Sequence, residues 1–360
     1  MQYICELEKC CGCKACMNIC PKQAIKMEMN EKGFEYPKIN QELCINCGLC
    51  KKVCPVNTPK KLNTPIKVYA CKNKNQTVRG SSSSGGVFEE ICKEILNENG
   101  IVYGAIFNSD NIVEHGKAET LEELEKIKKS KYVQSNMKKV YLKVREDLKL
   151  NKKVLFSGTP CQVEAIDNSN VINKENLFLV DVVCHGVPSP KIFEEYKNYL
   201  EEKYESKIIN VNFRFKNEKS TQNIKIDFEN GESYISNVSE GDYFYKLFLE
   251  DIILRDSCYE CKYKEFERYG DISLADFWGY EKGSAKNFGD NKGISLVLVN
   301  SEKGMRMFDK IKNNIDYMEV SKEECYPYNC FSNFSKPERY DRVWKDYLEN
   351  GFKETVKKYY

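Results

Sequence analysis

Two cysteine runs near the start of the chain share one spacing, C-x2-C-x2-C-x3-C-P. Their cysteines are, in order, Cys10, Cys13, Cys16 and Cys20, then Cys44, Cys47, Cys50 and Cys54. The second run follows the first at a constant offset of 34 positions, as from Cys10 to Cys44. So short a segment has little apolar core of its own, and it therefore folds around whatever its thiols bind.

The thiols are expected to be reduced rather than paired in disulfides. The chain begins MQYICELEKC, which lacks the charged, apolar and small-residue regions of a secretory signal. Disulfides persist in exported proteins and are rare in the cytosol. We therefore expect a cytoplasmic chain whose 18 cysteines are free to bind metal.

The evenly stepped spacing with a closing proline is typical of bacterial ferredoxins, in which the fourth cysteine of each run ligates the other cluster. The predicted ligand sets of two 4Fe–4S clusters are Cys10, Cys13, Cys16 and Cys54, and Cys44, Cys47, Cys50 and Cys20. Two zinc knuckles are the alternative, but zinc sites use close pairs of ligands. Cys11 falls outside the pattern, and we expect it to be a bystander. Residues 1–62 are predicted to form this ferredoxin-type domain.

Composition argues against two classes of partner. The chain is 41% hydrophobic and 31% charged, its mean hydropathy is −0.60, and it contains no apolar run long enough to cross a bilayer. Lysine and arginine number 56 against 54 aspartates and glutamates, and no long basic stripe stands out. We therefore expect neither a membrane span nor a nucleic-acid partner.

Beyond a Pro- and Lys-rich linker at 57–65, strand and helix patterns alternate along the chain. A Ser/Gly loop, RGSSSSGG, precedes an amphipathic helix that ends at Gly100, and the strand IVYGAIF follows. Such a loop can cradle a phosphate or be an ordinary turn into a helix. The alternation predicts an α/β fold, in which the small ferredoxin-like domain is followed by a larger α/β domain.

Four further cysteines lie at predicted strand ends or in a close pair. The strand VLFSG leads to Thr159 and Pro160, which cap and open a helix. The strand LFLVDVVC ends at Cys184, at the edge where open α/β sheets form their sites. The set comprises Cys161, Cys184, Cys258 and Cys261. It is proposed to hold a third 4Fe–4S cluster; a zinc site, or a metal-free pair with two unrelated buried cysteines, are the alternatives.

A series of motifs resembles one known family. In order, they are SSSSGGVF, SKYVQS, SGTPCQVEAI, CHGVPSP, SCYECK and DISLADFWG. This order is similar to that of the coenzyme F420 hydrogenase/dehydrogenase beta-subunit family, in which a fused ferredoxin with two clusters is common. The resemblance covers roughly residues 67–300. It divides the flavin- and cluster-binding domain into an N-terminal part at 67–150 and a C-terminal part at 151–315, before a tail at 316–360.

The resemblance implies a flavoprotein that holds FAD beside an iron–sulfur cluster. The residues that match the stretches expected to border the flavin are Ser83, Ser84, Gly85, Gly86, Lys131, Tyr132, Gln134, Ser135, Gly158, Thr159 and Pro160. It also favours iron over zinc for the third cysteine set. Of the two histidines, His185 could act on the cluster or the flavin or be structural, and His115 is expected to be exposed. Cys325 and Cys330 are expected to be structural or incidental.

The expected function is an iron–sulfur flavoprotein oxidoreductase. Clusters move single electrons and hydride carriers move two, and a flavin converts between them. The expected partners are a ferredoxin or a partner redox subunit, and a small-molecule hydride donor or acceptor such as coenzyme F420 or an organic substrate. An electron-transfer subunit of a larger complex, with no substrate of its own, is the alternative.

Overall fold

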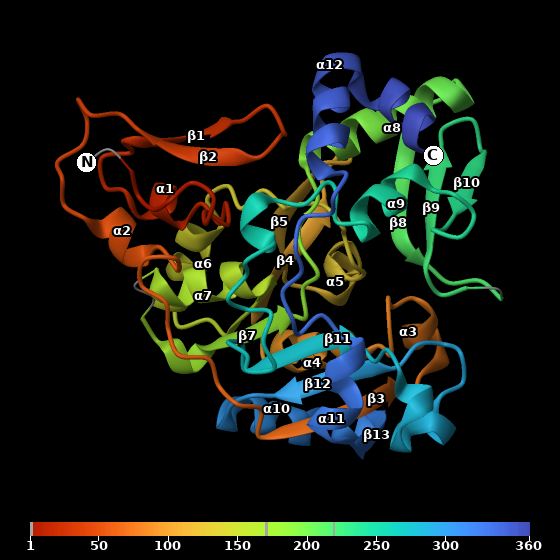
Figure 1. Cartoon of the computed structure of the whole chain (residues 1–360). Helices are drawn as coiled ribbons and strands as arrows, with labels where there is room; N and C mark the ends of the chain where they lie inside the picture. The colour runs from red at the N-terminus through yellow and green to blue at the C-terminus, as the bar shows by residue number, and fades with distance from the viewer. Residues whose placement is uncertain (1–2, 170–171, 219) are drawn as a thin grey trace.

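The computed structural model describes residues 3–169, 172–218 and 220–360. Its N-terminal region forms a small unit around the two cysteine runs (Figure 1). Each run contains a one-turn helix before its fourth cysteine, and an antiparallel hairpin lies between the two helices in the chain. The bounds are α1 Ala15–Ile19, β1 Ile25–Met29, β2 Glu35–Ile39 and α2 Leu49–Val53.

The larger domain is built on an eight-stranded mixed sheet, ordered β13-β3-β12-β11-β7-β6-β4-β5. Its strands are β3 Lys67–Asn73, β4 Ile101–Phe107, β5 Val113–Ala118, β6 Val154–Gly158, β7 Leu177–Val182, β11 Ile272–Asp276, β12 Ser295–Val299 and β13 Ile315–Glu319. The neighbours β11, β7, β6 and β4 run parallel, and the outer pairs are antiparallel. The predicted α/β class is confirmed, and the regions 67–150 and 151–315 share this one sheet.

Helices cover both faces of the sheet, which explains why its central strands are almost continuously apolar. On one face, Leu155 and Phe178 pack against α4, α5 and α10. On the other, Phe156 and Leu179 pack against α6 and α7, and this core continues into Ala15 of the ferredoxin-type region. The helices are α4 Val87–Asn97, α5 Leu121–Ile127, α6 Val140–Lys149, α7 Pro160–Asn168 and α10 Glu302–Ile311. The predicted helix starts after the Ser/Gly loop and at Pro160 are both confirmed.

A second, three-stranded sheet stands beside the large one (Figure 1). It packs with three helices around an aromatic core that includes Phe213, Phe244 and Trp344. The bounds are α8 Pro190–Tyr204, β8 Ile208–Phe215, β9 Asn223–Phe228, β10 Ser233–Ser236, α9 Tyr243–Leu249 and α12 Tyr340–Tyr359. The last helix therefore belongs to this core, and β13 adds an edge strand to the large sheet, so that most of the segment 316–360 is integrated into the fold.

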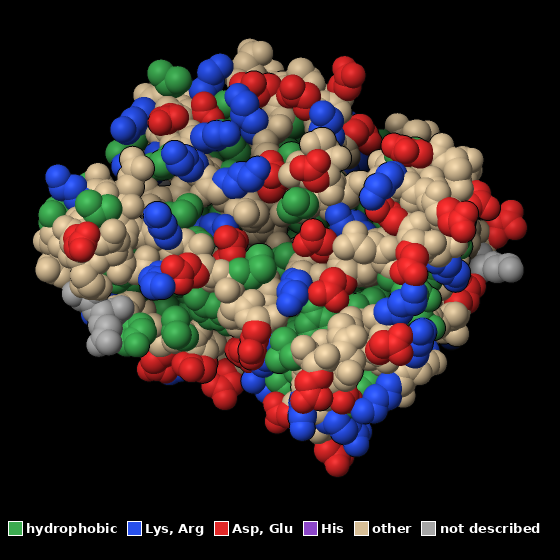
Figure 2. Space-filling model, turned by 90° about the horizontal axis from the view of Figure 1, so that it is seen from above, with side chains coloured by type: hydrophobic (Ala, Val, Ile, Leu, Met, Phe, Trp, Pro, Cys, Tyr) green, Lys and Arg blue, Asp and Glu red, His purple; other side chains and the backbone are tan. Residues whose placement is uncertain are grey.

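Short elements complete the described chain. They are α3 Gln76–Gly80, α11 Lys322–Cys325 and the 3-10 turns Lys174–Asn176, Asp256–Cys258, Tyr280–Lys282, Ser284–Phe288, Lys312–Asn314 and Tyr326–Tyr328. Within residues 3–169, 172–218 and 220–360, no helix is long and apolar enough to cross a membrane. Basic and acidic side chains are interspersed on the face seen in Figure 2.

Candidate functional site

The cysteines of the two runs gather in two sulfur-lined hollows. One hollow is lined by Cys10, Cys13, Cys16 and Cys54. The other is lined by Cys44, Cys47, Cys50 and Cys20. The fourth cysteine of each run thus lies with the first three of the other run, which is the grouping that crossed ligation requires.

The donor chemistry of these hollows fits iron–sulfur clusters. Four thiols converge in each hollow, and thiolates are the ligands of 4Fe–4S clusters. Among the described residues, no three His, Cys, Asp or Glu side chains come close enough together to hold a single metal ion. A zinc ion draws its ligands to about 2.0–2.3 Å from one centre, whereas a cubane spreads its four thiolates over four irons. Four thiols from a C-x2-C-x2-C-x3-C-P pattern in each hollow are the donor set of a 4Fe–4S cluster.

The two hollows differ in exposure. In the hollow of Cys10, each of the four predicted ligands is only 8% exposed. In the other hollow Cys47 is exposed and its three companions are partly so. The apolar side chains of Leu43 and Ile45 beside it are 51% and 57% exposed. One site therefore faces the rest of the protein, and the other faces outward.

Two cysteines outside the pattern also lie at the buried hollow. Cys5 forms side-chain hydrogen bonds with Cys10 and Cys54. Cys11, expected to be a bystander, forms side-chain hydrogen bonds with Cys13 and Cys161. Cys11 therefore stands between the ferredoxin-type region and the third cysteine set, a position that its offset from the repeated spacing did not reveal.

The third cysteine set comes from three parts of the α/β domain. Cys161 follows β6 at the start of α7, and Cys184 follows the parallel neighbour β7, so both lie at the same sheet edge. Cys258 ends a 3-10 turn, and Cys261 follows it. Cys184 interacts electrostatically with both members of the pair, and Cys161 does so with Cys261. The fold thus brings the four cysteines into one region of the domain.

A cavity of about 440 Å³ opens beside this set, at the carboxyl edge of the parallel strands. Eight of the eleven residues predicted to border a cofactor line it: Ser83, Ser84, Gly86, Lys131, Tyr132, Ser135, Gly158 and Thr159. Cys184 and His185 form part of the same wall. The cavity therefore adjoins the third cysteine set directly.

The other three predicted residues have different surroundings. An added Cβ on Gly85 would come within 2.4 Å of the Cys71 carbonyl oxygen of β3, so this glycine allows the Ser/Gly loop to approach the sheet. Pro160 is buried in the first turn of α7. The Gln134 side chain donates from Nε2 to the Cys11 carbonyl at 3.0 Å, and so contacts the ferredoxin-type region.

Basic groups give the cavity a positive wall. The buried Lys131 ammonium donates to the Lys128 carbonyl at 2.8 Å, and burial, with Lys129 nearby, lowers the pKa of Lys131 to about 7. Arg214 forms an ion pair with Asp276 at the end of β11. Behind the wall, the Lys216 ammonium donates to the Ser84 carbonyl at 2.7 Å. This arrangement suits an anionic ligand.

The expectation that His115 is exposed is wrong. It lies on β5, is 4% exposed and lines the cavity. Its Nε2 contacts the Ser157 carbonyl at 3.0 Å, and its Nδ1 contacts the Ser135 hydroxyl at 2.9 Å. A carbonyl can only accept, so Nε2 carries the proton of the neutral ring. Burial lowers the pKa of His115 to about 4. The polar residues around His115 in the sequence suggested exposure. The histidine is buried because other parts of the chain cover β5.

His185 lies beside two residues that the sequence did not single out, Asp251 and Cys330. Its Nε2 lies 2.7 Å from the Asp251 carboxylate, and its Nδ1 lies 3.6 Å from the Cys330 sulfur. Burial acts to lower the pKa of His185, but Asp251 and Cys330 outweigh it and raise the pKa to about 9. Cys330, expected to be structural or incidental, lines the cavity. It arrives there from a distant part of the chain.

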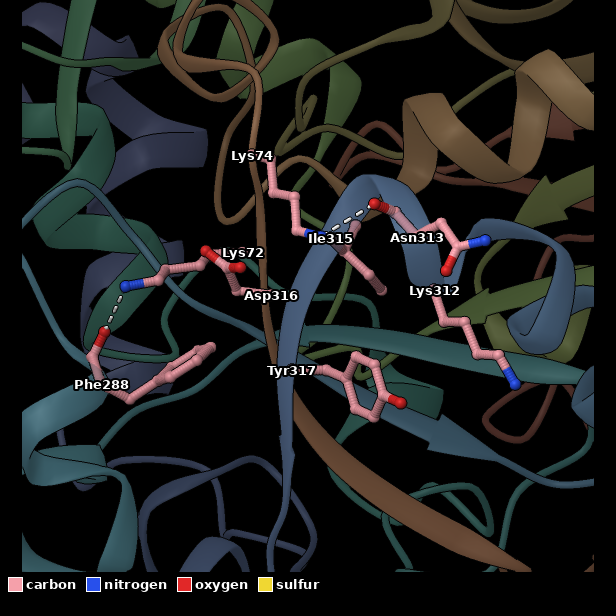
Figure 3. Close-up of a pocket in the computed structure, with 8 residues that line it drawn as sticks. All are labelled: Lys72, Lys74, Phe288, Lys312, Asn313, Ile315, Asp316 and Tyr317. Atoms are coloured by element: carbon pink, nitrogen blue, oxygen red, sulfur yellow. Dashed lines mark hydrogen bonds between the residues drawn. The ribbon is translucent and has the colours of Figure 1, made fainter.

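A further hollow, of about 580 Å³ and separate from the two sulfur-lined hollows and the cavity, lies on the surface at the β13 edge of the sheet (Figure 3). Lys72 and Lys74 contribute to its wall, and their ammonium groups donate to the carbonyls of Phe288 and Asn313. Neither a cysteine nor a histidine lines it. It lies apart from the sulfur chemistry, which identifies the first cavity as the candidate site.

The cysteine sites and fold define the class of an iron–sulfur electron-transfer protein, and family comparisons agree. Residues 9–58 match the family described as "4Fe-4S dicluster domain". Residues 151–324 match the family that describes the C terminus of the coenzyme F420 hydrogenase/dehydrogenase beta subunit. The chain is therefore similar to this beta-subunit family over residues 151–324 and carries a 4Fe–4S dicluster domain before the matched part.

Similar proteins include two from Methanocaldococcus jannaschii. An uncharacterized polyferredoxin-like protein is 40% identical over 57 residues, which cover 14% of this chain and 34% of that protein. An uncharacterized ferredoxin is 34% identical over 76 residues, covering 21% of this chain and 91% of that protein. The chain thus spans about a third of the first relative and most of the second.

A solved structure of the F420-reducing NiFe hydrogenase complex from Methanosarcina barkeri contains a chain with a similar arrangement. The TM-score is 0.49 at 15% sequence identity, and the match covers 82% of this chain and 92% of that chain.

Proposed function

We propose that the protein is an FAD-dependent iron–sulfur oxidoreductase. Electrons pass between a ferredoxin or partner redox subunit and FAD through three 4Fe–4S clusters, and FAD exchanges hydride with coenzyme F420 or an organic substrate. The observation that carries the proposal is the shared wall: Cys184 and His185 line the cavity whose other walls come from the loops matched to the family's flavin border.

The residues of the cavity fit a flavin nucleotide. Its volume of about 440 Å³ lies in the range of ligand pockets. Its lining combines apolar side chains, such as Val133, Val182 and Leu274, with the Ser/Gly loop that precedes α4. The loop that precedes α4 supplies small side chains at a helix N-terminus, which suits a diphosphate. When bound, a flavin accepts or donates a hydride and passes single electrons.

The thiols of the chain mark a continuous route to this cavity. The partly exposed hollow of Cys47 provides the entrance, the buried hollow of Cys10 follows, and Cys11 contacts Cys161 of the third set. Cys184 then borders the cavity. The chain's role is to hold successive sites close together, with the hollow of Cys47 open to a partner and the hollow of Cys10 buried.

Anaerobic cofactor analysis of the purified full chain tests this proposal. Iron, acid-labile sulfide and released flavin are quantified per chain, and about twelve irons, in three cubanes, with one FAD are expected. About eight irons without flavin would contradict the assignments to Cys161, Cys184, Cys258, Cys261 and the cavity.

A turnover assay distinguishes an enzyme from an electron-transfer subunit. The isolated chain, given an artificial electron donor and coenzyme F420, a nicotinamide or a candidate organic acceptor, is expected to reduce one of them. A flavin-loaded chain that reduces none of these acceptors would favour the electron-transfer subunit.

A further inference from the structure

Four arginines are buried among the described residues, and one of them has an unusual environment. Three pair with carboxylates, as Arg79–Asp290, Arg214–Asp276 and Arg268–Asp181. Arg255 is 0% exposed, yet no described carboxylate lies within ion-pair distance of its guanidinium. A buried charge without a counter-charge is costly, so this one requires an explanation.

The hydrogen bonds of Arg255 are satisfied by neutral groups. Nε donates to the Cys10 carbonyl at 2.6 Å, Nη1 donates to Gln134 Oε1 at 3.1 Å, and Nη2 donates to the Glu35 carbonyl at 3.0 Å. The guanidinium also lies 4.2 Å from the centre of the Tyr36 ring. These contacts orient the cation, but none of them neutralises it.

The position of Arg255 indicates where the missing negative charge comes from. The guanidinium holds the backbone of Cys10, a predicted ligand of the buried cluster, and Cys258 of the third set follows Arg255 by three residues. A cubane with four thiolate ligands is anionic and gains negative charge on reduction. The buried set would therefore place an anion beside the guanidinium, and the third set would place one next to the Arg255 backbone, whose carbonyl accepts from the Cys258 amide at 2.9 Å.

The loop of the first cysteine run lies close against the side chains of Arg255 and Gln134. Gly12 has a φ of +66°, and a Cβ added there would come within 2.7 Å of both Arg255 Nη1 and Gln134 Nε2. Gln134 in turn bridges Arg255 and the Cys11 carbonyl. The backbone of the buried cluster's loop is thus held directly on the arginine.

We propose that Arg255 is the shared counter-cation of the two clusters on either side of it, the buried one at Cys10, Cys13, Cys16 and Cys54 and the third at Cys161, Cys184, Cys258 and Cys261. It positions the two clusters relative to each other and raises both reduction potentials. The step it supports transfers one electron from one cluster to the other, with no bond made or broken. The proposal rests on the third cluster of the proposed function.

A redox titration of the full chain, loaded anaerobically and followed by EPR, tests the proposal. In Arg255→Gln, loss of the positive charge disfavours the reduced state of both flanking clusters. The equilibrium constant for reducing each should fall about tenfold, which is about 59 mV for one electron. The cluster at Cys47 should keep its potential. In Arg255→Lys the charge remains and both potentials should stay near those of the native chain.

Gln134→Glu provides a second test if Arg255→Gln fails to load its clusters. It places a carboxylate at the atom that Arg255 Nη1 already contacts, and should lower both potentials in the same way. Arg79→Gln is the matched control, because it removes a buried arginine whose partners are Asp290 and Gly293 rather than cysteines. It should leave all cluster potentials unchanged.

The outcomes separate the two proposals. If all three clusters are present and the two flanking potentials do not move in Arg255→Gln or Gln134→Glu, Arg255 is not their counter-cation, while the proposed function stands. If the reduction potential of only one of the two clusters beside Arg255 changes, the positive charge of Arg255 is not shared between them. If the native chain holds about eight irons, the third cluster of the proposed function fails, and the shared role fails with it.

Discussion

The two cysteine runs have the same spacing but opposite environments. Cys13 is 8% exposed, and its counterpart Cys47 is exposed. Cys11 contacts Cys161, while the residue at the same place in the second run, Ile45, points its apolar side chain to solvent. The first run packs against α6 and Arg255, whereas the second lies at the surface around Cys47 and enters the core only at Val53 and Cys54. A repeated motif therefore specifies a cluster site, and its packing decides whether that site is buried or open to solvent.

Replacing the fourth cysteine of each run with serine tests this comparison, and of the changes considered it should have the largest effect on cluster content and stability. Cys54→Ser should remove the buried cluster, about four irons, and destabilise the ferredoxin-type region by several kcal/mol, because this cluster is part of the core. Cys20→Ser should remove the exposed cluster with a smaller loss of stability. Iron content, EPR and urea unfolding measure these effects. Crossed ligation would be wrong if Cys20→Ser removed the buried cluster instead.

A change of pH should act on the α/β domain through His115. The unfolded ring takes up a proton near its usual pKa of about 6.5, while the folded ring stays neutral down to about pH 4. The contribution of His115 to stability should therefore fall by about 2 kcal/mol as the pH drops from 7 to 5, while His185, whose folded pKa is raised, acts in the opposite direction. Thermal or urea unfolding of the native chain and of His115→Gln measures the effect. An unchanged pH slope in His115→Gln would assign it to other groups.

The exposed hollow should be where a protein electron donor docks. Ile45→Glu places a charge in the apolar surface beside Cys47, and should slow reduction by a protein ferredoxin about tenfold. Reduction by dithionite, which needs no docking surface, should be unaffected. Stopped-flow absorbance measures both rates, and Ile235→Glu, another exposed isoleucine on the distant β10, is the control. Equal rates in all three proteins would place the donor elsewhere.

The smallest expected effect compares equivalent positions in the two runs. Asn18 is buried and donates from Nδ2 to the Lys138 carbonyl at 2.7 Å, which ties α1 to the segment before α6. Asn18→Ala should reduce the free energy of unfolding by about 1 kcal/mol. Its counterpart Lys52 is exposed, and Lys52→Ala should have almost no effect. Equal losses would show that the two runs are not packed differently.

Local patterns predict the elements of this protein well. The alternation of strands and helices, the helix start at Pro160 and the position of Cys184 after a strand depend on nearby residues, and each is confirmed. The prediction for His115 is wrong because its exposure depends on what covers β5, and the place of Cys330 escapes prediction because it reaches the cavity from a distant segment. Gln134 is expected at the cofactor, but its side chain contacts the ferredoxin-type region.

The sequence by itself determined the eight cysteines at a repeated spacing and the α/β framework, because ligand spacing and hydrophobic periodicity are local properties. Only the tertiary structure decided that the first cluster site is buried, that Cys11 meets Cys161 and that Arg255 has no carboxylate partner among the described residues. Burial and ion pairing depend on which distant segments pack together, and no local spacing encodes that.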